Sequence, residues 1–167
     1  SVWLLRPGMA LTLNGIAQGF ITDRCGELLG AYGFRHLLID MGEPRAMAAK
    51  PDGSAWQIGL ADPRAPSQSL HTLAVRDAAV ATSGGYGTLL DAAGRYTHLI
   101  DARNGRTAPA AESVTVVAPT AAQADALSTT LALLPNTEVA ARLALLRSHS
   151  GCRAICINSV GQISELS

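Results

Sequence analysis

The sequence predicts an α+β fold in which a mainly antiparallel sheet layer packs with about three helices. Segments rich in β-branched or aromatic residues recur between Gly, Pro and Asp residues, as expected for short strands. Only three segments have helical patterns, too few to alternate regularly with the strands of a doubly wound sheet. No repeat and no interdomain linker is found, so we expect residues 1–167 to form a single domain.

The element boundaries follow from these patterns in chain order. Residues 2–5 are expected to form a short strand, and a second apolar piece ends near Leu13. A helix is expected from about Ile16 to Tyr32, with Gly33 ending it. Its candidate inward-facing residues are Ile16, Phe20, Cys25, Leu28 and Leu29. Further strands are expected at residues 36–40, 56–61, 70–76, 96–100, 114–118 and 153–158.

Two more helices are expected in the second half of the chain. The segment from Thr120 to Gln123 is a capping-box pattern, which places a helix start there, and Pro135 ends that helix. Residues 138–147 form a further amphipathic helix. Residues 51–53 and 63–69 are expected to be polar connections.

Composition limits the classes of function. With 48% hydrophobic and 16% charged residues, the chain can bury one substantial core. Thirteen basic and thirteen acidic residues give zero formal charge, which provides no electrostatic footprint for nucleic acid or an anionic membrane. No long apolar run predicts a membrane-spanning segment. The first residues lack the features of a secretory signal, so we expect any targeting segment to have been removed already.

Three cysteines are an odd number and cannot form a closed disulfide framework. Cys152 and Cys156 flank an expected strand, whose rise would hold them beyond disulfide reach. We interpret all three as small buried apolar residues, and no accompanying His or Cys favours a metal role for this pair.

The helix that begins after Thr120 carries a feature that could bind a cation. Asp125 and Thr129 are four positions apart, so on a helix they share one face and can direct two oxygens at one point. Magnesium prefers oxygen ligands and usually takes only one or two carboxylates from a protein. The structural alternative is that Thr129 bonds back to the carbonyl of Asp125 and that Asp125 meets a nearby donor.

Three other segments could carry chemistry. In residues 13–20, Gly15 and Gly19 lie on either side of a helix start. Free N–H groups there can bind a phosphate, and the alternative is that the glycines only make a tight junction between strand and helix. Residues 81–87 are expected to be a loop of small and hydroxyl residues that could form a nest of N–H donors, or a plain loop. His98 and Asp101 bracket the end of an expected strand before an Asn-Gly turn, and His98 fits either a structural role or a general base.

Together these four segments, in this order, resemble the ApbE-like family of FAD:protein FMN transferases, whose fold is T-fold-like. The resemblance runs from about Leu11 to Asn158. Residues 14–20 with Asp23-Arg24 resemble the glycine-rich helix start of the family, and residues 79–84 resemble its small-residue loop. Residues 98–101 with Arg103 and Gly105 resemble its His-x-x-Asp turn, and residues 124–129 its metal helix. Residues 13–19 and 83–87 further resemble the NosX-like branch, which is associated with maturation of nitrous oxide respiration.

The resemblance implies a Mg²⁺-dependent enzyme that cleaves FAD and attaches FMN through a phosphoester to a Ser or Thr of a target flavoprotein, releasing AMP. It implies a metal site formed by Asp125, Thr129 and the carbonyl of Ala17. The catalytic candidates are His98, as general base, and Asp101. The candidate cofactor-binding residues are Gly15, Ala17, Gly19, Thr82, Ser83 and Gly84.

The sequence departs from the usual pattern of the family in two segments. Gln18 occupies a position where many members have Lys, and residues 40–44 replace a more usual Gly-Gly-Asp, which leaves Glu43 without an assigned role. Because family members are longer, we expect this chain to correspond to the C-terminal part of such a transferase. The alternatives are a non-catalytic or truncated flavin-binding module for assembly of a respiratory complex, and a Mg²⁺-dependent FAD pyrophosphatase. Analogy places the protein in the periplasm or on the periplasmic face of the inner membrane, and leaves a homo-oligomer open.

Overall fold

A computed structural model describes residues 2–93, 95–108, 112–135 and 137–167. The elements follow the order α1, β1 to β5, a 3-10 turn η1, β6, α2, α3, β7 and β8. The helices are α1 (Ala17–Ala31), α2 (Ala121–Leu133) and α3 (Val139–Arg147), and η1 is Gly85–Gly87. The strands are β1 (Leu37–Ile39), β2 (Arg45–Met47), β3 (Trp56–Asp62), β4 (Ala65–Val75), β5 (Ala78–Gly84), β6 (Ser113–Ala118), β7 (Arg153–Ile157) and β8 (Ile163–Leu166). The predicted α+β class with three helices is confirmed.

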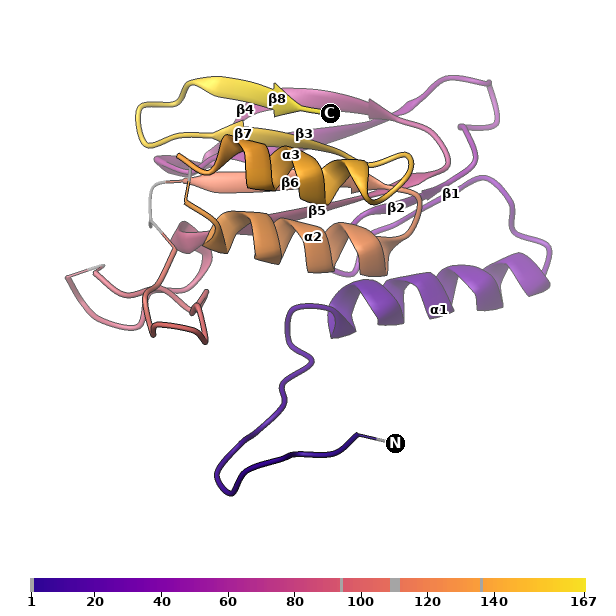
Figure 1. Ribbon diagram of the computed structural model, residues 1–167. Helices are drawn as coiled ribbons and strands as arrows, with labels where there is room; N and C mark the ends of the chain where they lie inside the picture. The colour runs from indigo at the N-terminus through magenta and orange to yellow at the C-terminus, as the bar shows by residue number, and fades with distance from the viewer. Residues whose placement is uncertain (1, 94, 109–111, 136) are drawn as a thin grey trace.

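A six-stranded antiparallel sheet in the order β1-β2-β5-β6-β7-β8 forms the middle layer. The helices α2 and α3 lie on one face of this sheet, and the β3-β4 hairpin lies on the other (Figure 1). Every residue of β6 is buried, because this central strand is covered on both faces. This burial explains why the strand has apolar residues on both of its faces, as expected for a strand with neither face exposed to solvent.

Two apolar clusters hold the three layers together. On the helix side, small residues of the sheet allow the helices to pack close to it. The larger side chains of this cluster come from the helices and are Leu127, Leu131 and Leu146. On the hairpin side, the cluster contains Ile58, Leu60, Leu73, Val75, Val80, Val117, Ile155 and Ile157. Burial of such side chains contributes about 1.5–3 kcal/mol each, so this packing fixes β5, β6 and α2 relative to one another.

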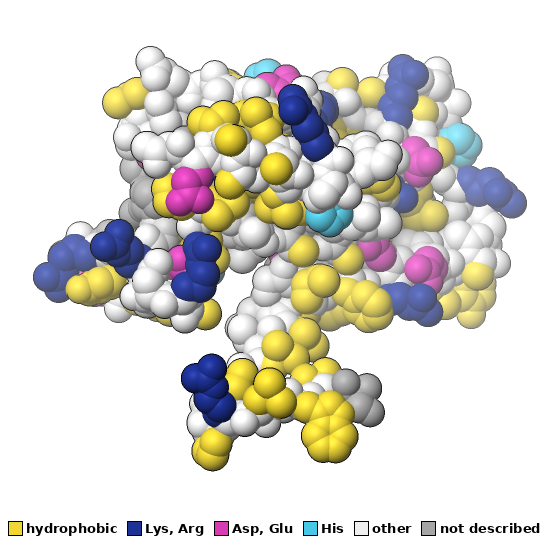
Figure 2. All heavy atoms as spheres, viewed as in Figure 1, with side chains coloured by type: hydrophobic (Ala, Val, Ile, Leu, Met, Phe, Trp, Pro, Cys, Tyr) yellow, Lys and Arg dark blue, Asp and Glu magenta, His cyan; other side chains and the backbone are white. Residues whose placement is uncertain are grey.

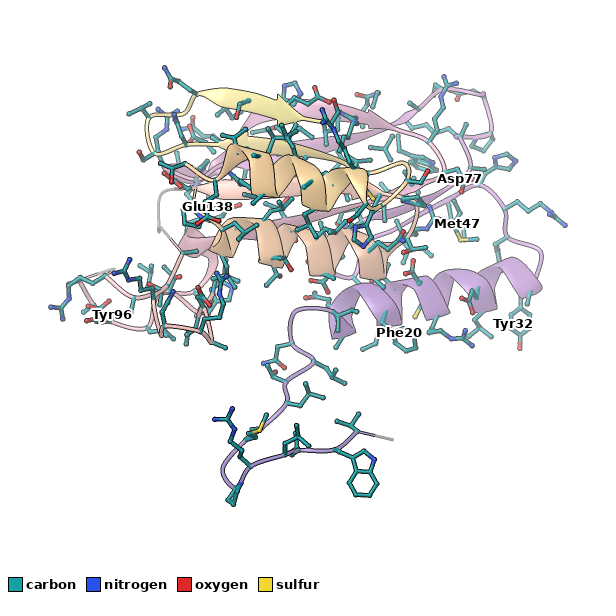
Figure 3. The ribbon with its side chains drawn as sticks, in the orientation of Figure 1. Phe20, Tyr32, Met47, Asp77, Tyr96 and Glu138 are labelled. Carbon is teal, nitrogen blue, oxygen red and sulfur yellow. The ribbon has the colours of Figure 1, made fainter. Side chains whose placement is uncertain are left out.

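The helix α1 matches its predicted range, but its predicted inward face is wrong at three of five positions, while Cys25 and Leu29 are half-buried. Ile16, Phe20 and Leu28 are 40–59% exposed, whereas the buried positions of α1 are Gly19, Thr22 and Gly26. Small residues face the body because Gly19 lies against the backbone of α2 and Gly26 lies against the side chains of Met47 and Ile39. In Figure 3, Phe20 and Tyr32 point away from the rest of the molecule.

Residues 2–13 do not form the predicted strand or any other regular element. They extend away from the body and carry exposed apolar side chains, which form much of the hydrophobic surface at the bottom of Figure 2. A strand requires a neighbouring strand to satisfy its backbone groups, and the described part of the chain places none beside this segment.

Several other predictions need correction. Residues 81–84 belong to the central strand β5 and not to a loop, and residues 65–69 lie in β4. Residues 96–100 form no strand and make only isolated bridges, Leu89 to Thr97 and Ile100 to Thr107. The strands β2 and β8 were not predicted, because each has fewer than five residues and lacks a clear alternating pattern. The three cysteines are free, as expected, but only Cys156 is fully buried.

No helix in the described ranges is long and apolar enough to cross a membrane.

Candidate functional site

The start of α1 is stabilised by a carboxylate from a distant helix. The residue before the helix, Ile16, makes no side-chain cap, so the first N–H groups of α1 need other acceptors. Asp125 of α2 supplies one, since its Oδ2 accepts a hydrogen bond of 2.9 Å from the Gly19 N–H. Asp125 is only 6% exposed, and its negative charge lies at the positive end of the α1 dipole.

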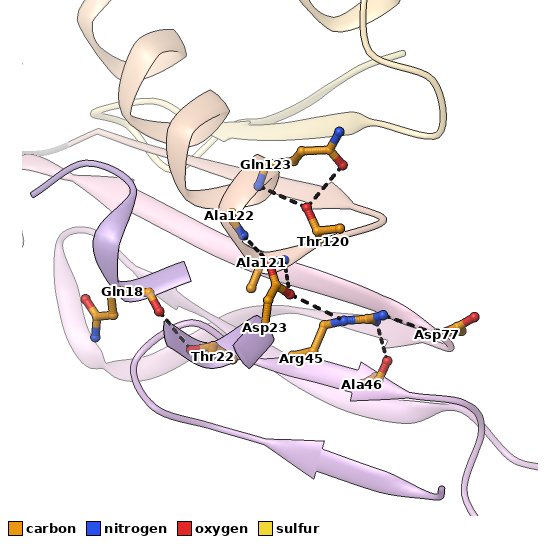
Figure 4. A network of polar contacts seen from close by, with 10 residues as sticks. All are labelled: Gln18, Thr22, Asp23, Arg45, Ala46, Asp77, Thr120, Ala121, Ala122 and Gln123. Atoms are coloured by element: carbon orange, nitrogen blue, oxygen red, sulfur yellow. Dashed lines mark hydrogen bonds and ion pairs between the residues drawn. The ribbon is translucent and has the colours of Figure 1, made fainter. Parts of the chain in front are cut away.

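The start of α2 receives the reciprocal contact from α1. The two carboxylate oxygens of Asp23 accept hydrogen bonds from the Ala121 and Ala122 N–H groups at 2.8 and 2.9 Å (Figure 4). Thr120 adds the predicted cap, with its Oγ1 3.2 Å from the Gln123 N. Each helix therefore donates one aspartate to the N-terminus of the other, which fixes how α1 and α2 meet.

Gly19 makes this close approach of the two helices sterically possible. A Cβ at position 19 would lie 2.3 Å from the Ala121 carbonyl oxygen and 2.9 Å from the Ala122 Cα. Both contacts are with backbone, which cannot move as a flexible side chain can. Gly19, the second glycine of the pattern in residues 13–20, therefore makes a tight junction between the helices, which was the alternative to phosphate binding.

Thr129 lies one turn after Asp125 and faces the same region. Its Oγ1 is 3.1 Å from Ser83 Oγ of β5, and its Cγ2 would be 3.3 Å from a Cβ placed on Gly15. The hydroxyl that bonds back to the Asp125 carbonyl belongs to Ser128, at 3.0 Å, and Ser128 also lies 2.8 Å from Ser83. Asp125 and Thr129 therefore face the same region, as helical periodicity predicts: Asp125 binds the Gly19 N–H, and Thr129 lies beside Gly15 and Ser83.

The candidate residues of β5 point to opposite faces of the sheet. Ser83 faces α2, through its contacts with Ser128 and Thr129. Thr82 is its neighbour in the strand, so its side chain points the other way, and its Oγ1 pairs with Thr115 Oγ1 at 2.8 Å. Gly84 is covered by the ring of Tyr86, which would lie 2.3 Å from a Cβ there. Only Ser83 of these three brings a side chain to Thr129.

A residue without a predicted role, Glu43, also reaches this region. Burial and the negative charges of Asp125 and Asp40 raise the pKa of Glu43 to about 8, against the lowering effect of the Thr82 backbone. Burial likewise raises the pKa of Asp125, while the Gly19 N–H opposes this shift. The sequence signal for Glu43 was its departure from the usual Gly-Gly-Asp pattern. We refer to the meeting point of Gly15–Gly19, Glu43, Ser83, Asp125 and Thr129 as the carboxylate corner.

His98 and Asp101 lie in a separate, locally bonded loop. The Nδ1 of His98 is 3.2 Å from the Thr88 carbonyl oxygen, which can only accept, so Nε2 is the basic nitrogen of the neutral ring. His98 is exposed, and its Cε1 would lie 3.6 Å from a Cβ on Gly87. Its ring therefore sits beside η1, which directly follows β5.

Asp101 organises the turn that follows His98. Its carboxylate accepts hydrogen bonds from the Arg103 side chain at 2.8 and 2.9 Å and from the Asn104 side chain at 2.8 Å. The Arg103 contacts, first of all, lower the pKa of Asp101 to about 2. Gly105, at φ +71°, completes the turn by donating its N–H to the Asp101 carbonyl at 2.7 Å. These local bonds give Asp101 an architectural role in the described structure.

A cavity of about 1080 Å³ lies next to this turn. Asp101, Arg103 and Arg106 line it together with residues from the end of α2, from α3 and from β7 and β8. Asp125 and Thr129 are not part of its lining, so the cavity and the carboxylate corner are separate features.

Comparisons with known proteins identify the family of the chain. The family model described as the ApbE family matches residues 2–156. The chain belongs to the ApbE family. It is 34% identical to the FAD:protein FMN transferase of Treponema pallidum in an alignment of 171 positions that covers 94% of this chain and 46% of that protein. It is also 34% identical to the enzyme of the same name from Klebsiella pneumoniae, over 78% of this chain and 41% of that one.

Solved ApbE structures have the same fold. The ApbE protein of Thermotoga maritima matches with a TM-score of 0.84 and 26% identity, over 96% of this chain and 52% of that chain. The apo form of the flavinyl transferase ApbE from Pseudomonas stutzeri matches with a TM-score of 0.70 and 28% identity, over 94% and 48%. This chain thus spans about half the length of the ApbE proteins it matches.

Proposed function

We propose that this chain carries the cation site and the catalytic loop of an FAD:protein FMN transferase. In this reaction FAD is cleaved, FMN is attached through a phosphoester to a Ser or Thr of a target flavoprotein, and AMP is released. The observation that carries the proposal is the carboxylate corner, where Asp125 and Thr129 of α2 meet the first turn of α1. The names of the relatives at 34% identity support the same activity.

The donors at the corner suit Mg²⁺. Asp125 uses Oδ2 for the Gly19 N–H, which leaves Oδ1 for a cation, and Thr129 adds a hydroxyl oxygen. The carbonyl of Ala17, between Gly15 and Gly19, is the proposed third ligand. The described residues hold no group of three or more His, Cys, Asp or Glu suited to a metal, so the proposed site uses mixed oxygen donors. Bound Mg²⁺ would neutralise charge on the FAD diphosphate during transfer.

The residues of the chain would then serve the transfer as follows. The acceptor hydroxyl oxygen forms a bond to the FMN phosphorus while the anhydride bond to the AMP phosphate oxygen breaks. Nε2 of His98 takes the proton of the acceptor hydroxyl, since Nδ1 is held by the Thr88 carbonyl. Asp101 keeps the loop in shape through Arg103 and Asn104. Gly19 packs against the Ala121 backbone and Gly84 is covered by the Tyr86 ring, so of the three candidate glycines Gly15 is the one whose backbone would allow FAD to approach closely.

We extend the proposal to the relation of this chain with whole transferases. The chain would correspond to their C-terminal part, which fits its 46% coverage of the Treponema pallidum protein. The exposed apolar side chains of α1 would then face further polypeptide. Residues 13–19 and 83–87 support a NosX-like branch, and family analogy supports action in the periplasm.

The test is to mix the purified chain with FAD, Mg²⁺ and an acceptor domain verified with an active ApbE transferase. We expect flavin fluorescence on the acceptor that survives a denaturing gel, together with AMP. Asp125→Ala should abolish it, because the diphosphate charge then lacks its carboxylate-bound counterion. AMP without acceptor labelling would indicate an FAD pyrophosphatase, and neither product would indicate a non-catalytic module.

A further inference from the structure

Glu43 is half-buried, and one oxygen of its carboxyl group is buried without a hydrogen-bond donor. Among the described residues, Oε2 of Glu43 has no hydrogen-bond partner. A buried acceptor of this kind costs free energy, and native structures leave few of them. The nearby Asp125 and Asp40 carry the same charge as an ionised Glu43, so they worsen the cost instead of offsetting it. This arrangement suggests a partner that the protein alone does not supply.

The loop that carries Glu43 is held mainly by backbone contacts, beside the hydrogen bond of the carboxyl group with the Thr82 backbone. Gly42 has φ +102°, a conformation that favours glycine, and its N–H is bonded to Asp40 Oδ1 at 3.1 Å. The carbonyl of Met41 accepts a bond of 2.7 Å from the Gln18 side chain. The carbonyl of Pro44 accepts the Val80 N–H at 2.8 Å. The loop is thus tied to α1 on one side and to β5 on the other, which fixes the carboxyl group beside Asp125.

The neighbouring arginine does not serve as counterion for Glu43. The Arg45 guanidinium bonds to the Ala46 carbonyl at 2.7 Å and lies near Asp23 and Asp77, at 3.8 and 3.4 Å (Figure 4). It therefore serves the contact between α1 and α2. The carboxyl groups of Glu43 and Asp125, together with the Thr129 hydroxyl that also contacts Ser83, are the oxygen donors that a hard divalent cation prefers.

We propose that Glu43 is a further carboxylate ligand for the divalent cation at Asp125 and Thr129. The inference rests on the proposed cation site and adds a ligand to it. With two carboxylates, the protein alone would balance the charge of a dication. Because the number of charged ligands sets affinity at such sites, the cation should bind before any nucleotide arrives.

The test is titration of the nucleotide-free chain with Mn²⁺, following free Mn²⁺ by electron paramagnetic resonance. Glu43→Gln should weaken binding about tenfold or more, in the range seen when groups at metal sites are removed. Glu43→Asp, which keeps the charge but shortens the side chain, should also weaken it. The matched control is Glu27→Gln, which removes the same charge from a side chain 60% exposed on α1. It should bind Mn²⁺ like the parent chain.

The outcomes separate this inference from the site on which it rests. If Asp125→Asn loses Mn²⁺ binding and both Glu43 variants keep it, the cation site stands and the role of Glu43 is overturned. If Glu43→Asp binds Mn²⁺ like the parent chain while Glu43→Gln does not, then Glu43 acts through its charge and not as a direct ligand, which also overturns the inference. If Asp125→Asn and the Glu43 variants all bind normally, the site itself is wrong. Failure of the parent chain to bind Mn²⁺ without nucleotide overturns the inference as well. Circular dichroism of each cation-free variant verifies folding.

Discussion

The carboxylate corner and the loop at residues 88–108 carry the two halves of the proposed chemistry, but they are built differently. The corner joins residues that are distant in sequence, since 106 positions separate Gly19 from Asp125 in their hydrogen bond. The loop is held by short-range bonds, such as those from Arg103 and Asn104 to Asp101. Cation binding therefore depends on how distant parts of the chain pack together, whereas the turn after His98 is shaped by hydrogen bonds between near neighbours in sequence.

The largest expected effect separates the two regions by function. His98→Ala should slow flavin transfer by about 10²- to 10⁴-fold, the contribution typical of a general base. Because His98 is exposed and distinct from the cation ligands, Mn²⁺ affinity and the thermal midpoint should stay the same. The measurement is the rate of covalent acceptor labelling beside an Mn²⁺ titration. An equal loss in both assays would make His98 structural and would remove the contrast between the regions.

The corner should be the more fragile region toward small changes in volume. Gly19→Ala should destabilise the chain by about 2 kcal/mol or more in urea unfolding, because the new methyl group overlaps the backbone of Ala121. The matched control is Gly30→Ala on the same helix, where the new Cβ would lie 3.4 Å from the flexible Met47 side chain. This control should be neutral or slightly stabilising, because alanine favours helix. Similar free energies of unfolding for both variants would mean that Gly19 does not pack against the Ala121 backbone as closely as described.

The reciprocal capping of α1 and α2 can be tested from the other side. Asp23→Ala should cost about 1–2 kcal/mol, because it removes the acceptors for two N–H groups at the start of α2. Asp77→Asn is the control, since Asp77 is 76% exposed, contacts the other side of Arg45 and has φ +41°, a conformation that Asn tolerates as Asp does. It should change unfolding by less than about 0.5 kcal/mol. Equal effects would show that Arg45, and not the cap, carries the contribution of Asp23.

The two regions should respond to pH with opposite sign. The pKa of Glu43 rises from 4.5 to about 8 on folding, so the cation-free domain should lose stability as pH rises through this range. The pKa of Asp101 falls from 3.8 to about 2, so its stabilisation is present above 3.8 and is lost as pH falls toward 2. Unfolding midpoints of the parent chain and Glu43→Gln across pH 4 to 8 measure the first effect. Because the pKa of Asp125 is also raised, part of the slope should remain in Glu43→Gln, and an undiminished slope would contradict the role of Glu43.

The sequence revealed those features that depend on local spacing. The shared face of Asp125 and Thr129 follows from helical periodicity, and the Thr120 cap follows from its pattern with Gln123. The Thr120 cap is confirmed, and the contacts of Asp125 with Gly19 and of Thr129 with Ser83 place both side chains in one region. The alternation that places Thr82 and Ser83 on opposite faces was missed, because a run of small residues was interpreted as a loop and not as the buried strand β5.

Features that depend on tertiary packing could not be predicted. The exposed face of α1 has its apolar residues, including Phe20, at helical spacing, which is the ordinary signature of a core face. Only the steric fit of Gly19 against Ala121 explains why the opposite face is buried. The proximity of Glu43 to Asp125 likewise depends on the loop at Gly42 and on the pairing of β2 with β5. No local pattern encodes these contacts.

The central claim is that α1 and α2 together hold a divalent cation at the carboxylate corner. The most direct measurement is the anomalous difference map of a crystal of this chain grown with Mn²⁺. The account predicts one strong peak about 2.0–2.5 Å from a carboxylate oxygen of Asp125 and from Thr129 Oγ1. A fully occupied peak elsewhere, or no peak at this corner at saturating Mn²⁺, would contradict it.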